Sequence, residues 1–212
     1  VRLGKVEPHR ARRARRALTV TSDLARCAPA DIAIEAVFED AELKLTVIKE
    51  LASALRAEAV LATSSSTLPL ERIAAAIPHP ERLIGLHFYK PAHIMQLVEI
   101  ARAAQTGTNA LEQATALVRA IGKTPVIVDD SPGRLVNRIG QAYWGEALRL
   151  LDERPLDVET IDRLMEGIGF PMGPFRLVDF LGGDTAYTIS TTLWEASFHH
   201  PRYRPHLRQQ QM

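Results

Sequence analysis

Short apolar runs alternate with longer amphipathic stretches over the first 130 residues, and this alternation constrains the fold more than any other feature. An apolar run bounded by turn residues is typical of a buried strand, whereas apolar residues three or four positions apart are typical of a helix. Strands and helices in alternation indicate an α/β domain with a mostly parallel sheet. We expect strands at residues 18–21, 32–37, 59–63, 83–88, 95–100 and 125–128, and helices at residues 42–55, 70–77 and 108–121.

The alternation stops near residue 130, and only helical patterns follow it. Residues 131–133 (Ser-Pro-Gly) resemble the start of a long helix through residue 151, with Ser131 as its N-cap and proline in the first turn. Asp157 is positioned to cap a second helix that ends near residue 165. Two further helices are expected at residues 175–181 and 184–198. The sequence therefore predicts an α/β domain with a mostly parallel sheet over residues 1–130 and an all-helical domain over residues 131–212.

The composition is that of a soluble globular protein, with 24% charged and 46% hydrophobic residues. This balance excludes a collagen-like repeat, a disordered tail and a disulfide scaffold. No segment approaches the roughly 18 consecutive apolar residues of a membrane span, and the basic N-terminus lacks the apolar stretch of a secretory signal. The single cysteine, Cys27, cannot form an internal disulfide, so we expect a cytoplasmic protein with no membrane partner.

The first 16 residues carry seven lysines and arginines against one acidic residue, Glu7. Such a run is typical of an exposed helix or of a surface that binds nucleic acid or another phosphate-bearing ligand. The run RARRARR contains no aromatic residue, and no nucleic-acid-binding motif follows it. We therefore expect an exposed arginine-rich helix and no nucleic-acid partner, with a phosphate-bearing ligand as the alternative.

Four polar features interrupt segments that are otherwise apolar or structural. His87 lies near the end of one expected strand, Glu99 lies within another, residues 64–67 (Ser-Ser-Ser-Thr) follow a strand end, and Asn137 lies early in the long helix. Ligands of open α/β sheets bind beyond the carboxyl ends of strands, where several of these residues would lie. Each feature also has a structural interpretation when taken singly: a core histidine, a solvent-facing glutamate, a turn or cap, and a surface asparagine.

Glu99 is the most informative of these residues. A carboxylate within an apolar strand has a large desolvation cost unless a cation or several donors meet it. A histidine is a suitable partner, because the carboxylate fixes its tautomer and stabilises the imidazolium. The segments that contain His87 and Glu99 are consecutive, so we expect them to be neighbours in space. No metal site is expected, because the histidines near the C-terminus lack partners at a recognised ligand spacing: His199, His200 and His206.

Eight short segments are informative in combination, although none of them is specific when taken alone. They are residues 30–40 (ADIAIEAVFED), 62–68 (ATSSSTL), 85–91 (GLHFYKP), 97–99 (LVE), 122–125 (GKTP), 130–133 (DSPG), 136–138 (VNR) and 169–175 (GFPMGPF). Together, and in this order, they resemble the L-3-hydroxyacyl-CoA dehydrogenase family, the NAD-dependent enzymes of fatty-acid β-oxidation and related acyl-CoA pathways. The resemblance covers nearly the whole chain and implies a Rossmann-type domain followed by a helical domain.

The resemblance also implies roles for individual residues. His87 lies where the family places its catalytic base, and Glu99 lies where it places the carboxylate that orients that base. Ser66 and Asn137 match residues that hydrogen-bond the substrate and support the histidine. The implied reaction oxidises an L-3-hydroxyacyl-CoA to a 3-ketoacyl-CoA, in a homodimer formed through the helical domain. The implied contacts to NAD are Ala36, Glu39, Lys44, Ser66 and Lys90.

The chain also departs from the family pattern. In the family, a first strand, a G-x-G-x-x-G turn and a second strand precede the position of Val1, and a glycine- and lysine-rich segment follows the position of Met212. We therefore expect a fragment of a longer protein or a truncated gene product, and weak NAD binding by residues 1–212 alone. Lys90 stands where the family usually has asparagine and brings positive charge toward the nicotinamide, and Ser64 replaces another asparagine of the family pattern.

Two alternatives stay open. A related hydroxy-acid dehydrogenase, such as an L-gulonate dehydrogenase-like protein, shares the scaffold, and the serine-rich residues 64–67 suit it. Residues 170–175 favour the acyl-CoA branch instead. The second alternative is a truncated, non-catalytic subunit of the same family whose helical region serves assembly. Such a subunit would keep its oligomeric mass and show no turnover.

Overall fold

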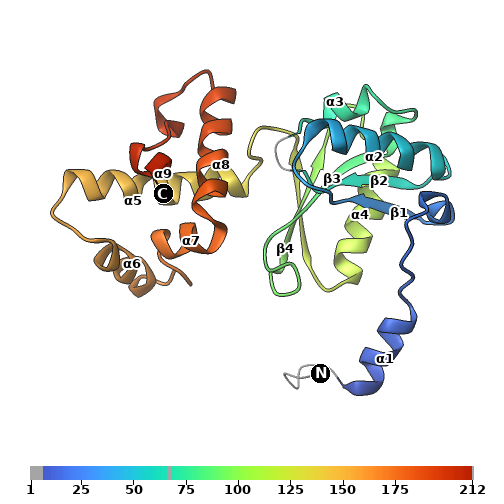
Figure 1. Ribbon diagram of the computed structural model, residues 1–212, viewed down its shortest axis with the longest axis horizontal. Coiled ribbons are helices and arrows are strands. Elements are labelled where there is room, and N and C mark those ends of the chain that lie inside the picture. The colour runs from blue at the N-terminus through green and yellow to red at the C-terminus, as the bar shows by residue number, and fades with distance from the viewer. Residues whose placement is uncertain (1–6, 66–67, 212) are drawn as a thin grey trace.

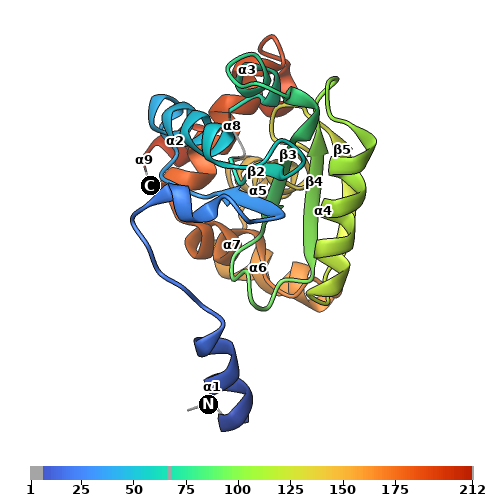
Figure 2. The ribbon, with the colours of Figure 1, turned by 90° about the vertical axis from the view of Figure 1, so that its right-hand side faces the viewer.

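The computed structural model describes residues 7–65 and 68–211, which form an α/β lobe and a helical lobe (Figure 1). The first helix, α1 (Pro8–Arg16), has no buried residue and stands clear of both lobes in Figures 1 and 2. This confirms the expected exposed arginine-rich helix over residues 8–16. None of the helices in the described ranges is long and apolar enough to cross a membrane.

The α/β lobe is built on a five-stranded sheet whose strand order follows the chain order. The pairs β1–β2, β2–β3 and β4–β5 are parallel, whereas β3–β4 is antiparallel, which confirms the expected mostly parallel sheet. The strands are β1 (Ile32–Glu35), β2 (Val60–Thr63), β3 (Leu83–Phe88), β4 (Leu97–Arg102) and β5 (Thr124–Asp129). Each lies within two residues of an expected strand, because short apolar runs flanked by turns were sufficient to locate them.

Helices cover both faces of the sheet, as Figure 2 shows for α2 on one side and α4 on the other. Side chains alternate between the two faces along a strand. Accordingly, Leu61 and Leu83 pack against α2 and α3, whereas Ala62 and Ile84 pack against α4. The helices of this lobe are α2 (Ala41–Ala54), α3 (Leu70–Ala74) and α4 (Thr108–Ala120), with 3-10 turns η1 (Leu24–Cys27) and η2 (Pro80–Arg82).

The helical lobe follows β5 and contains no strand within its described residues. Its core gathers around Trp144, whose indole N–H donates to Ser190 Oγ over 3.3 Å, and includes Phe175. Asp157 caps a helix as expected, because its Oδ1 accepts the Thr160 N–H over 2.7 Å. The elements are α5 (Val136–Glu153), α6 (Val158–Gly167), α7 (Pro174–Leu181), α8 (Gly183–Ala196), η3 (Pro201–Tyr203) and α9 (Leu207–Gln211).

The strand expected at residues 18–21 is wrong. This segment has no regular secondary structure, and the side chains of Leu18 and Val20 are 74% and 95% exposed. Within the described residues, β1 pairs only with β2, so no strand lies beside residues 18–21 to supply a hydrogen-bonded ladder. A β-branched run forms a strand only when it finds such a neighbour and a surface to pack on.

The N-cap expected at Ser131 is also wrong, because α5 begins only at Val136. Gly133 and Arg134 both have left-handed backbone conformations, with φ of 68° and 48°. A right-handed helix cannot continue through such residues, so the chain turns before α5 starts. The first amides of α5 therefore need an acceptor from elsewhere in the molecule.

Candidate active site

His87 and Glu99 face each other across the antiparallel pair β3–β4, in which they are direct register partners. The Nδ1 atom of His87 lies 3.2 Å from Oε2 of Glu99. The carboxylate is fully buried, whereas the His87 side chain retains 16% of its exposure. The predicted proximity of the two residues is confirmed. The carboxylate is thus held inside the protein while the imidazole reaches toward its surface.

The Glu99 carboxylate accepts four hydrogen bonds. Oε2 is shared by His87 Nδ1 and the hydroxyl of Tyr89, and Oε1 accepts the backbone N–H groups of Leu135 and Val136, each over 2.9 Å. Glu99 therefore supplies the acceptor that the start of α5 lacks, and it joins the sheet to the helical lobe. Burial alone raises the pKa of Glu99, but the hydrogen bonds from His87, Tyr89 and Val136 outweigh it and hold the pKa below its usual value.

Tyr89 lies two residues after His87, and their rings are 4.6 Å apart and tilted. Burial of the phenol, together with its hydrogen bond to ionised Glu99, raises the pKa of Tyr89 far above its usual value. The protonated, hydrogen-bond-donating form of the hydroxyl is therefore favoured. Sequence reasoning missed Tyr89, although the two-residue period of a strand places it on the same side as His87.

Arg134 packs beneath this pair and is 2% exposed. A Cβ atom at Gly85 would lie 2.9 Å from Arg134 Nη2, so a glycine on β3 makes room for the guanidinium. Its Nε lies 3.9 Å from Oδ1 of Asp130, and burial lowers the pKa of Arg134. Nε and Nη1 have no hydrogen-bond partner anywhere in residues 7–65 and 68–211. No sequence signal identified this arginine, because its burial depends on the left-handed turn before α5.

A second polar cluster lies at the carboxyl ends of β1 and β2. Lys44, 1% exposed, donates to Glu35 Oε1 over 2.8 Å and to the Val37 carbonyl over 2.9 Å, and its Nζ lies 3.3 Å from Glu39 Oε2. Glu35 also accepts the Thr63 hydroxyl over 2.6 Å. Two predicted cofactor residues, Glu39 and Lys44, therefore meet each other. Glu35 was missed, although it interrupts an apolar strand just as Glu99 does.

The other predicted site residues are less closely connected. Asn137 lies in the first turn of α5, next to Val136, and forms no hydrogen bond with the other site residues in the described part of the chain. Ala36 is exposed directly after β1, and Lys90 is exposed two residues after the end of β3. Ser66 lies outside the described residues. The structure thus brings together His87 with Glu99 and Glu39 with Lys44.

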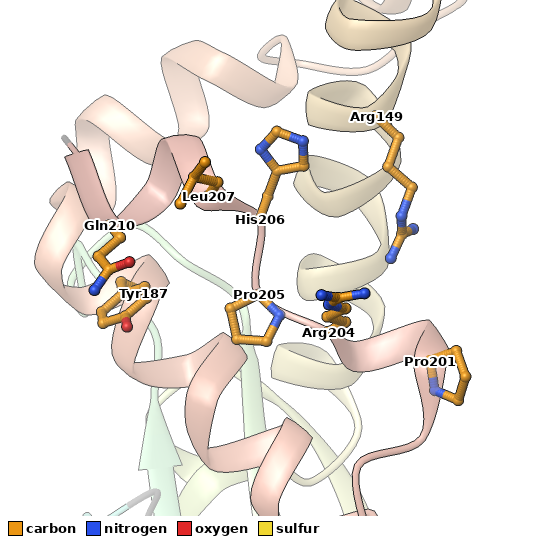
Figure 3. A pocket seen from close by; sticks show the side chains of 8 residues that line it. All are labelled: Arg149, Tyr187, Pro201, Arg204, Pro205, His206, Leu207 and Gln210. Atoms are coloured by element: carbon orange, nitrogen blue, oxygen red, sulfur yellow. The ribbon is translucent and has the colours of Figure 1, made fainter.

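Two cavities lie in the helical lobe and contain none of the predicted site residues. One, of about 620 Å³, is a nearly apolar groove between α5, α6 and α7 that includes Ile139 and Phe170. The other, of about 600 Å³, is shown in Figure 3, where Arg149 from α5 and Arg204 from the segment after η3 lie on one side. The lining of this second pocket includes neither His87 nor Glu99.

The fold and the site together define a class of two-lobed α/β proteins. In this class a histidine–carboxylate pair lies in the sheet, and the carboxylate also binds the first helix of the helical lobe. Comparison with known families is more specific. The family model described as 3-hydroxyacyl-CoA dehydrogenase, NAD binding domain, matches residues 1–131, and that described as 3-hydroxyacyl-CoA dehydrogenase, C-terminal domain, matches residues 133–212. The chain belongs to the 3-hydroxyacyl-CoA dehydrogenase family.

Named relatives support this assignment. The chain is 36% identical over 210 residues to a 3-hydroxyadipyl-CoA dehydrogenase of Escherichia coli K12, covering 99% of this chain and 44% of that protein. It is 41% identical over 155 residues to a fatty acid oxidation complex subunit alpha of Acinetobacter baylyi, covering 73% of this chain and 22% of that subunit. The chain therefore spans less than half the length of these relatives.

Solved structures are similar over the whole chain. A 3-hydroxybutyryl-CoA dehydrogenase from E. coli K12 superposes with a TM-score of 0.94 at 36% identity, covering 99% of this chain and 45% of that one. An (S)-3-hydroxybutyryl-CoA dehydrogenase from Ralstonia eutropha gives the same TM-score at 31% identity, covering 100% and 75%.

The residues present suit the nicotinamide half of NAD. Ala36 is a small exposed residue at the carboxyl end of a parallel strand, where a flat ring can approach the backbone. Glu39 is 44% exposed, and its carboxylate is an acceptor suited to ribose hydroxyls. Lys44 fits a supporting role better than a direct one, because its ammonium is buried against Glu35, Val37 and Glu39.

Proposed function

We propose that this chain forms part of an NAD-dependent L-3-hydroxyacyl-CoA dehydrogenase and carries its proton-transfer residues. The observation that carries the proposal is the His87–Glu99 pair. Because Nδ1 of His87 points to a buried, ionised carboxylate, that nitrogen carries a proton, and Nε2 is the atom left to face a substrate. A base with one nitrogen fixed and the other available is the arrangement that oxidation of an alcohol needs.

In this proposal each proton-transfer or stabilising role is assigned to a named residue. His87 Nε2 accepts the proton of the 3-hydroxyl group as the C3–H bond breaks and a ketone forms. NAD, when bound, supplies the acceptor for the hydride that leaves C3. Glu99 stabilises the imidazolium that results, and Ser66 and Asn137 hydrogen-bond the substrate oxygen. In the reverse direction, protonated His87 returns its proton to the ketone oxygen.

We divide the proposed cofactor contacts into direct and supporting ones. Ala36 and Glu39 would contact the nicotinamide half, while Lys44 holds Glu39 and the loop after β1 in place. Lys90, exposed after β3, would bring positive charge to the same side. Ser66 completes the proposed set.

We also propose an acyl-CoA substrate in a cytoplasmic homodimer that assembles through the helical lobe. The relatives named for 3-hydroxyadipyl-CoA and for fatty acid oxidation support the substrate class. Exposed apolar side chains support the assembly: Ile139, Leu164 and Ile168 are 62%, 58% and 73% exposed. Apolar surface on that scale favours association.

The test uses the complete gene product and follows NADH consumption with acetoacetyl-CoA. His87→Gln should lower the rate by about 10²–10⁴-fold, because it removes the general acid–base group. His93→Gln is the matched control, since His93 is exposed in the turn after β3 and should leave the rate unchanged. An unchanged rate in His87→Gln would refute the proposal. Turnover of L-gulonate in place of acetoacetyl-CoA would favour the sugar-acid alternative, and retained assembly without turnover of either would favour the non-catalytic subunit.

A further inference from the structure

The Tyr89 hydroxyl and the His87 ring donate to the same oxygen of the same carboxylate. Oε2 of Glu99 accepts both the Tyr89 hydroxyl and His87 Nδ1, the latter over 3.2 Å. The other oxygen, Oε1, is already occupied by the backbone N–H groups of Leu135 and Val136. Within the described residues, His87 therefore depends on an oxygen that a second donor also uses.

Two donors on one carboxylate oxygen divide its charge. A hydrogen bond to an ionised acceptor draws negative charge toward the donor, so each bond weakens the other. The Tyr89 phenol remains protonated, as described above, so this division persists across the working pH range. The proposed function has no step for Tyr89, and the division of charge gives this residue a role.

The charged side chains near Glu99 do not take over the role of the Tyr89 hydroxyl on Oε2. Arg134 lies beneath Glu99 and Tyr89, but it forms no hydrogen bond to either, and Asp130 beside it offsets its charge. The Glu39 carboxylate also acts on Arg134 and raises its pKa. Lys90, exposed after β3, is open to solvent, which screens its charge. Within residues 7–65 and 68–211, only the Tyr89 hydroxyl and His87 Nδ1 donate to Oε2.

We propose that Tyr89 is a positioning residue that holds Glu99 Oε2 and limits how strongly the carboxylate stabilises protonated His87. This inference rests on the proposed function. Tyr89 thereby sets the pH range in which His87 accepts a proton from the alcohol. It touches neither substrate nor cofactor and acts only through Glu99.

Removing the Tyr89 hydroxyl should shift the pH profile of activity in a defined direction. In Tyr89→Phe, all of Oε2 is available to His87, and the imidazolium becomes more stable. Alcohol oxidation needs neutral His87, so the acid limb of its kcat/KM profile should move to higher pH. Ketone reduction needs protonated His87, so its activity should extend to higher pH as well. The shift should be about 0.5–1 pH unit, the size that one hydrogen bond contributes.

The experiment measures pH profiles of the complete gene product in both directions. Tyr143→Phe is the matched control, because it removes a hydroxyl that donates to the Met172 carbonyl over 3.0 Å in the helical lobe. That variant should keep the wild-type midpoints. A loss of stability or rate in Tyr89→Phe with both midpoints unchanged would overturn the inference and leave the proposed function standing. Loss of activity in wild type itself would count against the proposed function instead.

A second variant covers the case in which Tyr89→Phe does not fold. Placing 3-fluorotyrosine at position 89 keeps the ring and strengthens the hydroxyl as a donor. More of the Glu99 charge then goes to the phenol, so both midpoints should move to lower pH, opposite to the effect of phenylalanine. Midpoints that stay fixed, or that move to higher pH, would contradict the proposal.

Discussion

Two carboxylates lie buried on one face of the same sheet, and they differ in the kind of partner they meet. Glu35 meets Lys44, a permanent cation, together with the Thr63 hydroxyl. Glu99 meets His87, whose ring gains and loses a proton, together with Tyr89 and backbone amides. A carboxylate paired with a fixed charge stabilises structure, whereas one paired with an imidazole can respond to proton transfer. Burial alone does not distinguish the two.

The two buried cations show the same contrast. Lys44 and Arg134 are 1% and 2% exposed. The Lys44 ammonium contacts two carboxylates and a carbonyl, whereas two nitrogens of Arg134 have no partner among the described residues. A buried charge contributes to stability only when its desolvation is matched by contacts. Equal burial therefore predicts unequal effects of substitution.

The largest effect is expected for Lys44→Met. This variant leaves Glu35 buried without its cation, which should lower the free energy of unfolding by about 3–5 kcal/mol. Urea unfolding of the complete gene product, followed by circular dichroism, measures it. The double variant Glu35→Leu/Lys44→Met should regain most of the loss, because no lone charge remains. A single variant as stable as wild type would show that the pair is not structural.

A much smaller effect is expected for Arg134→Met, although this cation is equally buried. The desolvation cost of its guanidinium is only partly offset by contacts. Replacing it with an apolar side chain should therefore change the unfolding free energy by about 1 kcal/mol or less, in either direction. The same unfolding measurement compares it with Lys44→Met. A loss as large as that of Lys44→Met would mean that Asp130 or Glu99 depends on this cation for its charge.

The smallest effect is a pH dependence of stability. Because the folded pKa of Glu99 lies below its unfolded value, its contribution is complete above the unfolded pKa and is lost as pH falls through the folded one. The stability advantage of wild type over Glu99→Gln should therefore shrink below about pH 4.

Asp130 provides the control of opposite sign for this measurement. Burial raises the pKa of Asp130, so the folded protein holds this proton more tightly than the unfolded chain does, and stability is lost as pH rises through that pKa. Asp130→Asn should thus gain stability relative to wild type with rising pH. If the unfolding free energies of Glu99→Gln and Asp130→Asn, each relative to wild type, changed in the same direction with pH, the predicted difference between the two carboxylates would be contradicted.

The sequence located most elements but not the contacts between them. The strands expected at residues 83–88 and 95–100 lie at 83–88 and 97–102, and their succession along the chain correctly placed His87 beside Glu99. Residues 18–21 failed because strand formation depends on a neighbour that propensity does not report. Ser131 failed as a cap because two left-handed residues delay α5 and a distant carboxylate caps it.

The site residues that sequence reasoning missed also separate into those with a local sequence signal and one whose burial depends on contacts between elements. Glu35 carried the signal that identified Glu99, a carboxylate in an apolar strand, and Tyr89 carried the two-residue period of β3. Both were accessible to sequence reasoning. The burial of Arg134 was not, because it depends on a turn conformation and on the space that Gly85 leaves. Local patterns predict elements and faces, whereas partners across the sheet depend on register and turns.

The central claim is that His87 and Glu99 act as one proton-transfer unit, and a double-mutant cycle tests it most directly. The rates of acetoacetyl-CoA reduction would be compared for His87→Gln, Glu99→Gln and the double variant of the complete gene product. If the residues act as a unit, the double variant should be no slower than His87→Gln, because Glu99 has no other ring to orient. Losses that multiply in the double variant would show that the two residues act independently and would contradict the account.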